Sequence, residues 1–442
     1  MIFNDLSSSI VPFQDSSYDT FYYNVSTQTN FKASFLASGG NITGNTNALS
    51  ASGDCRFIVF GTAASGIVSG INYSKTQIYI RDTLLSVNIL VSQNDSGSFG
   101  NQNSAYYASI SYDGSLVAFE SEATNLSPLA SSGLVNNIFL RNLTDNTTTL
   151  ISVNSSSAIL NSASATPNLS GNGRFVIFIS SATNVDPLAN GTPQLFLRDL
   201  QSQTTVLLSQ TGGASFTGSA SISTQAISYD GSLVVFYGTG NNFIYPDNNP
   251  GNSQCFLVNT TSGNVTRIAN LPNGAQSDGV CTNPVISSDG RFIGFISTST
   301  LIYPLIPNTL ATQVAYIYDL VEGTTTPILN YTGQIPSGNI NNVYISSQAS
   351  TIAFSTASTD MVSFPTSPGV AQIFMAVPLC SLNNAGGCAN GGSCALNGSW
   401  TCSCPSGWTD FACDQCKSRL RQRERELWRK RRILTRNLGM GG

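Results

Sequence analysis

One short motif recurs along most of the chain at a nearly constant interval, and this repeat limits the possible folds more than any other feature. The motif is typified by SYDGSLVAF at residues 111–119. Counted between first serines, consecutive copies are 59, 59, 58, 59 and 59 residues apart. Such a period indicates small structural units that bury their apolar faces against one another. The copies begin at Ser52, Ser111, Ser170, Ser228, Ser287 and Ser346.

Each unit predicts four short β-strands. The adjacent Asp and Gly of the motif mark a hairpin turn between the first two strands. The second strand is apolar at successive positions, as in residues 116–119, so both of its faces are expected to be buried. A third strand, such as NIFLRN at residues 137–142, and a fourth, such as TTTLIS at residues 147–152, complete the unit.

Four-stranded units in a fixed phase predict an all-β protein with a β-propeller, in which each blade packs against both neighbours. A β-sandwich needs no fixed phase and a parallel β-helix has shorter repeats, so both fit less well. The start of the chain aligns with the later half of a unit, and residues 31–38 are candidates for the fourth strand that the last unit lacks. We expect a ring over residues 1–379 that the N-terminal strands close, with seven sectors. Six is the close alternative, with residues 1–28 outside the ring.

The turn and strand at residues 111–119 resemble the TolB-type family of WD-like propeller repeats, whose hallmark is SxDGxxVAF. The resemblance extends over residues 45–377 and implies the propeller fold. It implies no single activity, because such blades occur in enzymes, translocation factors and adhesive surface proteins. A periplasmic helper protein of the TolB type is one possible function, but the cysteine-rich segment after the repeats argues against it.

Seven of the ten cysteines fall in residues 380–416, a density typical of a small disulfide scaffold in an oxidising compartment. Their spacing, with NGGSC and CSCPSGW, resembles an EGF-like module, and the final CDQC resembles the start of a laminin-type extension. Cys416 is then a free thiol, an intermolecular link or a sign that the natural chain continues differently. The segment MAVPLC lacks the acidic residues of calcium-binding modules, so no calcium is expected there. The resemblance implies the disulfides Cys380–Cys394, Cys388–Cys402 and Cys404–Cys413.

Two cysteines within the repeats are candidates for a further disulfide. Cys255 and Cys281 fall in neighbouring strands of consecutive units, where two buried free thiols are the alternative. Cys55 has no obvious partner. Asn-X-Ser/Thr sequons fit a secreted glycoprotein, although a chain this rich in Asn, Ser and Thr produces many at random. The candidates for N-glycosylation are Asn72, Asn125, Asn142, Asn264 and Asn397.

Charge is unevenly divided along the chain. Residues 1–416 carry nine Lys and Arg against 21 Asp and Glu, a net −12, and residues 417–442 carry ten against two, a net +8. We expect this basic tail to be disordered or a short helix, with binding to a polyanion or an anionic membrane as the functional alternative to a solvated tail. Nucleic-acid binding is not expected beside a disulfide scaffold. No stretch has the length of a membrane span, and no signal peptide is visible.

The composition argues against several kinds of catalytic site. The chain has no histidine, which excludes Ser-His-Asp and Cys-His catalysis and histidine metal sites. The only glutamates before the tail are Glu120, Glu122 and Glu322, and no carboxylate pair recurs as a glycosidase would require. Asp186 and Asp247 offer oxygen ligands for a hard cation, but ordinary Asx turns explain them equally well. No catalytic residue, cofactor or metal site is therefore predicted.

Arginines recur at two positions of the repeat. A ring of arginines is what a carboxylate-binding, sialidase-like propeller would use, but the sialidase Asp-box separates its Asp and Gly by one residue, and here they are adjacent. The preferred interpretation is structural, with each arginine paired to the Asp or Asn that follows it. One set comprises Arg81, Arg141 and Arg198, and the other comprises Arg56, Arg174 and Arg291.

Together these features predict a secreted or cell-surface protein for adhesion, matrix or surface assembly. Its propeller loops are expected to recognise a protein or a glycan, with the EGF-like module as a rigid spacer. The alternative is an extracellular carbohydrate-active propeller enzyme, which converging carboxylates near the central channel would favour.

Overall fold

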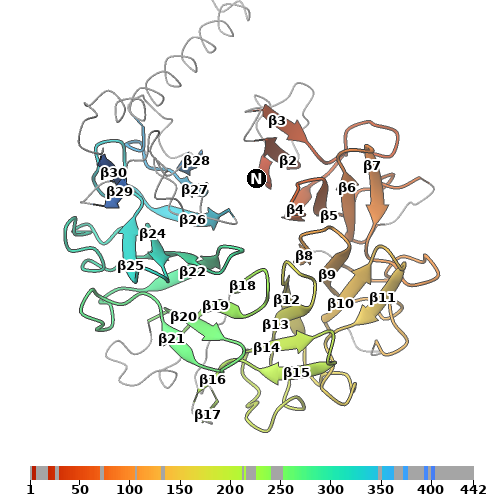
Figure 1. The fold of residues 1–442 in the computed structure, drawn as a ribbon. Coiled ribbons are helices and arrows are strands. Elements are labelled where there is room, and N and C mark those ends of the chain that lie inside the picture. Colours follow the sequence, from red (N-terminus) through yellow and green to blue (C-terminus); the bar gives the residue numbers. More distant parts are fainter. Residues whose placement is uncertain are drawn as a thin grey trace, which may run out of the picture.

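The computed structural model describes most of the repeat region. The described residues are 2–5, 18–24, 29–69, 74–104, 107–130, 135–211, 214–215, 225–239, 252–346, 351–362, 372–376, 393–396 and 400–403. They form antiparallel sheets arranged as the blades of a β-propeller (Figure 1). In the described part of the chain, no helix has the length and hydropathy of a membrane span.

Six successive blades follow the repeat. Within each blade the strands pair in sequence order. The first blade contains β4 (Thr46–Ala51), β5 (Phe57–Thr62), β6 (Gln77–Asp82) and β7 (Val87–Leu90), and the second β8 (Ala108–Ile110), β9 (Leu116–Ser121), β10 (Asn137–Asn142) and β11 (Thr147–Leu150). The third contains β12 (Ser164–Leu169), β13 (Phe175–Ser180), β14 (Gln194–Asp199) and β15 (Thr204–Leu207).

The later blades have the same order. The fourth contains β18 (Gln225–Ile227), β19 (Leu233–Gly238), β20 (Gln254–Asn259) and β21 (Val265–Arg267), and the fifth β22 (Cys281–Ile286), β23 (Phe292–Ser297), β24 (Val314–Asp319) and β25 (Thr324–Pro327). The sixth has three strands, β26 (Ile340–Ile345), β27 (Ile352–Thr356) and β28 (Gln372–Ala376). A small hairpin of β16 (Gln210–Thr211) and β17 (Ala214–Ser215) lies between the third and fourth blades in sequence.

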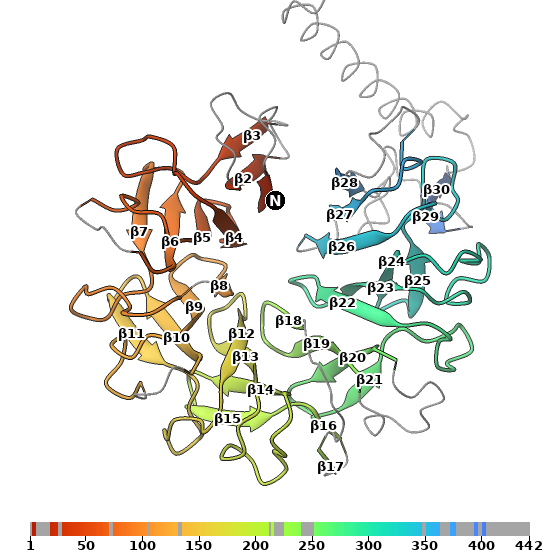
Figure 2. The same cartoon turned by 180° about the vertical axis from the view of Figure 1, so that it is seen from behind.

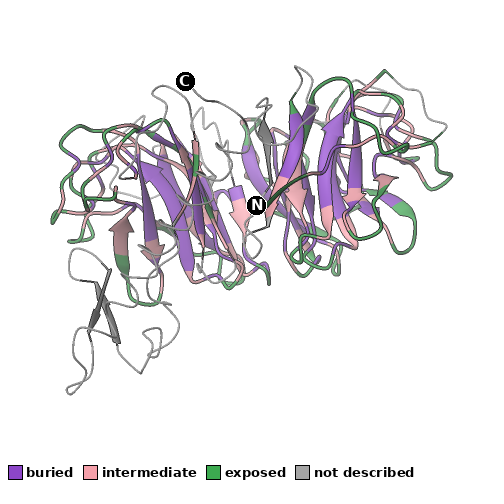
Figure 3. Cartoon of the chain, turned by 90° about the horizontal axis from the view of Figure 1, so that it is seen from above, coloured by how far each residue is buried: buried purple, intermediate pink, exposed green. Residues whose placement is uncertain are grey.

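The second strand of each complete blade is buried on both faces, as its continuous apolar run predicts. In β9, Val117, Ala118 and Phe119 are fully buried. Phe119 lies opposite Phe139 of β10, and their rings stack with centroids 5.7 Å apart. Equivalent aromatic pairs join the second and third strands of the other blades. Buried residues thus run through the strands, whereas exposed residues gather in the connections (Figure 3).

The Asp-Gly turns stabilise single blades and also connect neighbours. Asp113 Oδ1 accepts hydrogen bonds from Ser111 Oγ and from the backbone of Ser115. Gly114 takes a φ of +77°, which glycine adopts without strain. The backbone N–H of Tyr112 donates to the carbonyl of Gly171 in the next blade over 3.0 Å. A Cβ on Gly171 would lie 2.3 Å from the Tyr229 ring, so this close approach of turns requires a residue without a side chain.

A disulfide joins the fourth and fifth blades. Cys255 of β20 and Cys281 of β22 are bonded, with their Cα atoms 5.4 Å apart. Both residues are buried. The structure therefore has the bridge, not the two free thiols that were its alternative, whereas Cys55 is a free and exposed cysteine.

The N-terminal strands form a sheet of their own. β1 (Ile2–Asp5), β2 (Asp19–Asn24) and β3 (Thr29–Lys32) pair in that order, and β1 and β2 pack against β4. The pairing expected between residues 31–38 and the last blade does not occur among the described residues, because β3 pairs with β2. The structure thus has six blades, the alternative number, with this sheet beyond the first of them (Figure 2).

In the described part of the chain, the third strand of the last blade is more exposed than its counterparts. Ile373 of β28 is 48% exposed, whereas Ile138, at the same repeat position in β10, is fully buried. Beyond this blade, β29 (Ser393–Leu396) and β30 (Trp400–Ser403) form a hairpin in which Cys394 lies opposite Cys402. The other cysteines of the expected EGF-like module and residues 417–442 lie outside the described residues, so this module and the tail stay predictions.

Candidate functional site

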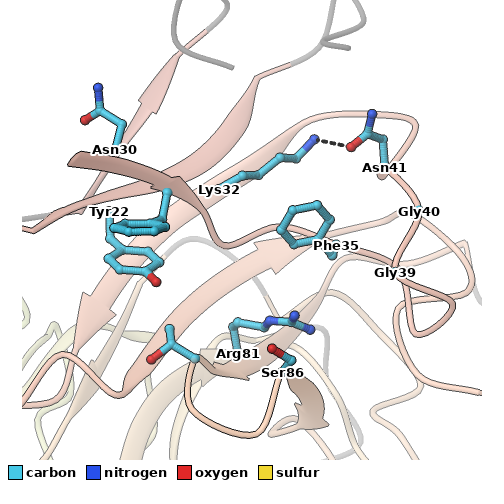
Figure 4. Close-up of a pocket in the computed structure, with 11 residues that line it drawn as sticks. Tyr22, Asn30, Lys32, Phe35, Gly39, Gly40, Asn41, Arg81 and Ser86 are labelled. Carbon is cyan, nitrogen blue, oxygen red and sulfur yellow. Dashed lines mark hydrogen bonds between the residues drawn. The ribbon is translucent and has the colours of Figure 1, made fainter. Parts of the chain in front are cut away.

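A pocket lies between the N-terminal sheet and the first blade. Its volume is about 670 Å³. The walls combine aromatic rings, two cationic side chains and several neutral polar groups (Figure 4). The lining residues come from β2, β3, the loop after β3, β6 and the turn before β7: Tyr22, Asn30, Phe31, Lys32, Phe35, Gly39, Gly40, Asn41, Arg81, Thr83 and Ser86.

Lys32 is a cation with partners. Its Nζ donates to Asp19 Oδ2 over 2.8 Å and to Asn41 Oδ1 over 3.1 Å. The side chains of Lys32 and Asp19 are 5% and 1% exposed, so the ion pair is shielded from water. Lys32 therefore adds little net charge to the pocket, because Asp19 neutralises it.

Arg81 is a cation without a carboxylate partner. Its Nη1 donates to Asn88 Oδ1 over 3.2 Å, and in the described residues no carboxylate lies within ion-pair distance. The guanidinium lies 5.5 Å from the centroid of Phe35, whose ring lies between Arg81 and Lys32 (Figure 4). Burial lowers the pKa of Arg81, although an arginine remains charged. The pocket thus contains one guanidinium that forms no ion pair with a described carboxylate, although the charge of Asp82 acts on it.

The guanidinium groups of the two other arginines at this repeat position are buried and hydrogen-bonded within their own turns. Arg141 and Arg198 are 1% and 2% exposed. Arg141 donates to the backbone carbonyl of Asn146 over 2.8 Å and to its side-chain Oδ1. Arg198 donates to the carbonyl of Gln203 over 2.7 Å and to its Oε1 over 2.6 Å. In both blades, Nη2 of the arginine therefore donates to the amide oxygen of the side chain five residues later.

A shorter side chain in the first blade makes the difference. Ser86 is the residue five positions after Arg81 and lacks an amide oxygen that could reach the guanidinium. Ser86, Asn146 and Gln203 all have a positive φ, of 57°, 61° and 58°, so the turns share one backbone geometry. The partial exposure of Arg81 therefore follows from the side chain at position 86, not from a different turn.

The loop of the preceding sheet adds a second difference. For the second blade this loop follows β7 of the first blade and contains Asp95. Asp95 accepts a hydrogen bond from the backbone of Thr148, and its charge acts on Arg141. Asn88 donates to the Phe35 carbonyl over 2.7 Å, just as Thr148 donates to that of Gln93, so the two loops correspond. Counting from these residues, Ala37 takes the place of Asp95. The first blade thus lacks the acidic neighbour as well.

The second set of arginines has a structural role. Each forms an ion pair with the Asp at the end of the third strand of its own blade, at 2.7 Å, and lies over the ring of the following Phe. The prediction that arginines pair with the next Asp or Asn is therefore wrong in its partner, since cross-strand neighbours are closer than sequence neighbours. The pairs are Arg56–Asp82, Arg174–Asp199 and Arg291–Asp319.

The acidic candidates that the structure describes lie apart from one another. Asp186 Oδ1 accepts the backbone N–H of Leu188, an ordinary Asx turn, and Asp247 lies outside the described residues. Glu120 is buried between two blades, where it accepts hydrogen bonds from Asn136 and from the backbone of Thr166, and burial raises its pKa. Within the described residues, no group of three His, Cys, Asp or Glu could hold a metal ion.

The glycosylation candidates differ in accessibility. The side-chain amide of Asn125 donates to the Phe99 carbonyl and accepts the backbone N–H of Asn101, so this asparagine is part of a loop contact. Asn142 is half-buried, and Asn264 is exposed in the turn before β21. Asn72 and Asn397 lie outside the described residues, and glycosylation at all five stays a prediction.

The fold defines the class of protein as a β-propeller. No known family matches the sequence, and no curated protein matches it. Similar solved structures include TolB from Acinetobacter baumannii, with 14% identity and a TM-score of 0.39 over 73% of this chain and 61% of that one. An oligogalacturonate lyase in complex with manganese has 10% identity and a TM-score of 0.49 over 82% of this chain and 83% of that one. The β-propeller domain of the Trilobed protease from Pyrococcus furiosus has 10% identity and a TM-score of 0.45 over 75% of this chain and 82% of that one. This chain spans less than two thirds of the TolB chain, and these likenesses concern the fold alone.

Proposed function

We propose that this chain is a secreted or cell-surface binding protein that recognises a negatively charged group on a partner at the pocket beside Arg81. The observation that carries the proposal is the guanidinium of Arg81. It faces a pocket and has no carboxylate partner, whereas the side chains of Asn146 and Gln203 occupy the equivalent guanidinium groups. A partly buried cation that forms no ion pair favours an incoming anion.

The extracellular location is supported by the cysteines. The buried bridge between Cys255 and Cys281 favours an oxidising compartment, as does the expected EGF-like module. This module would then act as a spacer between the propeller and whatever follows it.

A binding role accounts for the pocket better than the alternative of a carbohydrate-active enzyme. Among the residues that the structure describes, those that line the pocket include no Asp or Glu. Hydrolysis of a glycosidic bond ordinarily uses two carboxyl groups on either side of the bond, one as an acid. The lining groups can hold a ligand by charge, hydrogen bonds and ring contacts, but they supply no carboxyl group for the acid role.

The proposal is tested by isothermal titration calorimetry with sodium acetate and sodium sulfate at constant ionic strength. We expect at least one of these anions to bind the wild type, and Arg81→Ala to weaken binding about tenfold or more, because a charge-assisted hydrogen bond is lost. Arg174→Ala is the matched control, since it removes the same charge from the third blade and is expected to change the affinity less than about twofold. Equal affinity in wild type and Arg81→Ala, or no binding of either anion, would contradict the proposal.

A further inference from the structure

We infer that the anion bound at this pocket is the carboxylate of a sugar acid, the charged residue of an acidic glycan. This inference rests on the proposed function, and it adds the chemical class of the ligand. Three properties of the pocket support it, namely its charge, its aromatic rings and its neutral polar groups.

The charge of the pocket suits a single carboxylate. Asp19 neutralises Lys32, so Arg81 supplies one net positive charge. Its planar guanidinium presents parallel N–H donors that match the two oxygens of a carboxylate. A phosphate monoester, with a charge near −2, would keep about one uncompensated charge in a partly buried site, which is unfavourable.

The aromatic rings suit the apolar face of a sugar ring. Tyr22 and Phe31 stack with centroids 5.1 Å apart, and Phe31 is 42% exposed. Phe35 lies next to them on the same wall and contacts the guanidinium. A pyranose carries C–H groups on one face, and burying them against aromatic rings removes apolar area from water. A small anion without such a face would leave the rings uncovered.

The remaining groups suit hydroxyls. Asn30 and Ser86 contribute an amide and a hydroxyl group that both donate and accept hydrogen bonds. Asn41 and Thr83 also line the pocket, where Asn41 Oδ1 accepts from Lys32 and the Thr83 hydroxyl donates to the Arg56 carbonyl. The pocket volume of about 670 Å³ lies within the range of small-molecule sites. Ser86 and Phe31 are both exposed, so a bound sugar residue remains accessible for attachment to a longer glycan.

One substitution is expected to occupy the guanidinium of Arg81 without replacing Arg81 itself. Ser86→Asn places at position 86 the residue that Arg141 uses in the second blade, where Asn146 Oδ1 accepts from the guanidinium. Asparagine tolerates the positive φ of this turn, so the variant is expected to fold. Ser86→Ala is its matched control, because it removes the hydroxyl and leaves the guanidinium accessible.

The experiment is calorimetry on the whole chain with sodium glucuronate, glucose, sodium acetate, sodium sulfate and the dipeptide Gly-Glu at constant ionic strength. We expect glucuronate to bind about tenfold or more tightly than acetate, sulfate or glucose, because charge, hydroxyl and ring contacts combine. Ser86→Asn should weaken glucuronate binding about tenfold, and Ser86→Ala no more than about threefold. Circular dichroism and urea unfolding confirm that both variants are folded.

The outcomes separate the ligand class from the proposed function. If acetate binds as tightly as glucuronate, or if sulfate or Gly-Glu binds more tightly, the pocket binds anions but the sugar-acid assignment is wrong. If glucuronate binds Ser86→Asn and wild type equally, its site lies elsewhere and the inference is wrong. If no anion binds, the proposed function is wrong as well.

Discussion

The first and second blades place an arginine at the same position and use it differently. Arg141 is buried under the amide of Asn146 and beside Asp95. Arg81 faces a pocket, because Ser86 and Ala37 replace these neighbours. The comparison shows that a residue repeated for structural reasons becomes available for binding when one side chain in its own turn and one in the neighbouring loop are shortened.

The largest expected effect is the loss of the buried arginine. Arg141→Ala removes a side chain that is 1% exposed and leaves the oxygens of Asn146 and Thr148 without their donor. We expect the free energy of unfolding to fall by about 3–4 kcal/mol, against less than about 1 kcal/mol for Arg81→Ala. Urea unfolding measures both. Equal losses would mean that Arg81 is as structural as Arg141.

An intermediate effect is expected when the second blade is made like the first. Asn146→Ser withdraws the amide oxygen from Arg141, and we expect a loss of about 1–2 kcal/mol, since a buried charged donor loses its acceptor. The double variant Asn146→Ser with Asp95→Ala should create a second anion site, seen as a stoichiometry near two in calorimetry. A stoichiometry that stays at one would show that these two side chains do not by themselves define the pocket.

The smallest expected effect on stability comes from the second set of arginines, Arg56, Arg174 and Arg291, each of which forms the same ion pair in its own blade. Hydrogen bonds from Arg56 and Arg174 hold the pKa of Asp82 and of Asp199 below the usual range. The pKa of Asp319 is also lowered, because the raising effect of burial is outweighed by the hydrogen bond from Arg291 together with those from the backbone N–H groups of Val321 and Glu322.

A lowered pKa means that the folded state binds protons less readily than the unfolded chain, so these pairs stabilise the fold above about pH 4 and lose their effect as the pH falls below it. Urea midpoints between pH 2 and pH 6 should decrease toward low pH, and Asp82→Asn should flatten the curve. A flat wild-type profile would contradict this.

Much of the fold was predictable from sequence, because the signals are local. The turn after the first serine of the motif and the apolar second strand recur from unit to unit, and the structure contains them in five four-stranded blades. The candidate site was predictable only in part. The phase of Arg81, Arg141 and Arg198 was visible, but Lys32, Phe35 and Ser86 were missed, although comparing position 86 with 146 and 203 could have identified the last.

The sequence by itself determined the strands of each blade, the all-β class and the pair of cysteines placed to join two blades, since these depend on hydrophobic pattern and turn chemistry over short distances. Only the tertiary structure decided that the blades number six, that β3 pairs with β2 and that Arg81 faces a pocket. These outcomes depend on packing between sheets, because the surroundings of Arg81 combine Ser86 of its own turn with Phe35 from the loop after β3.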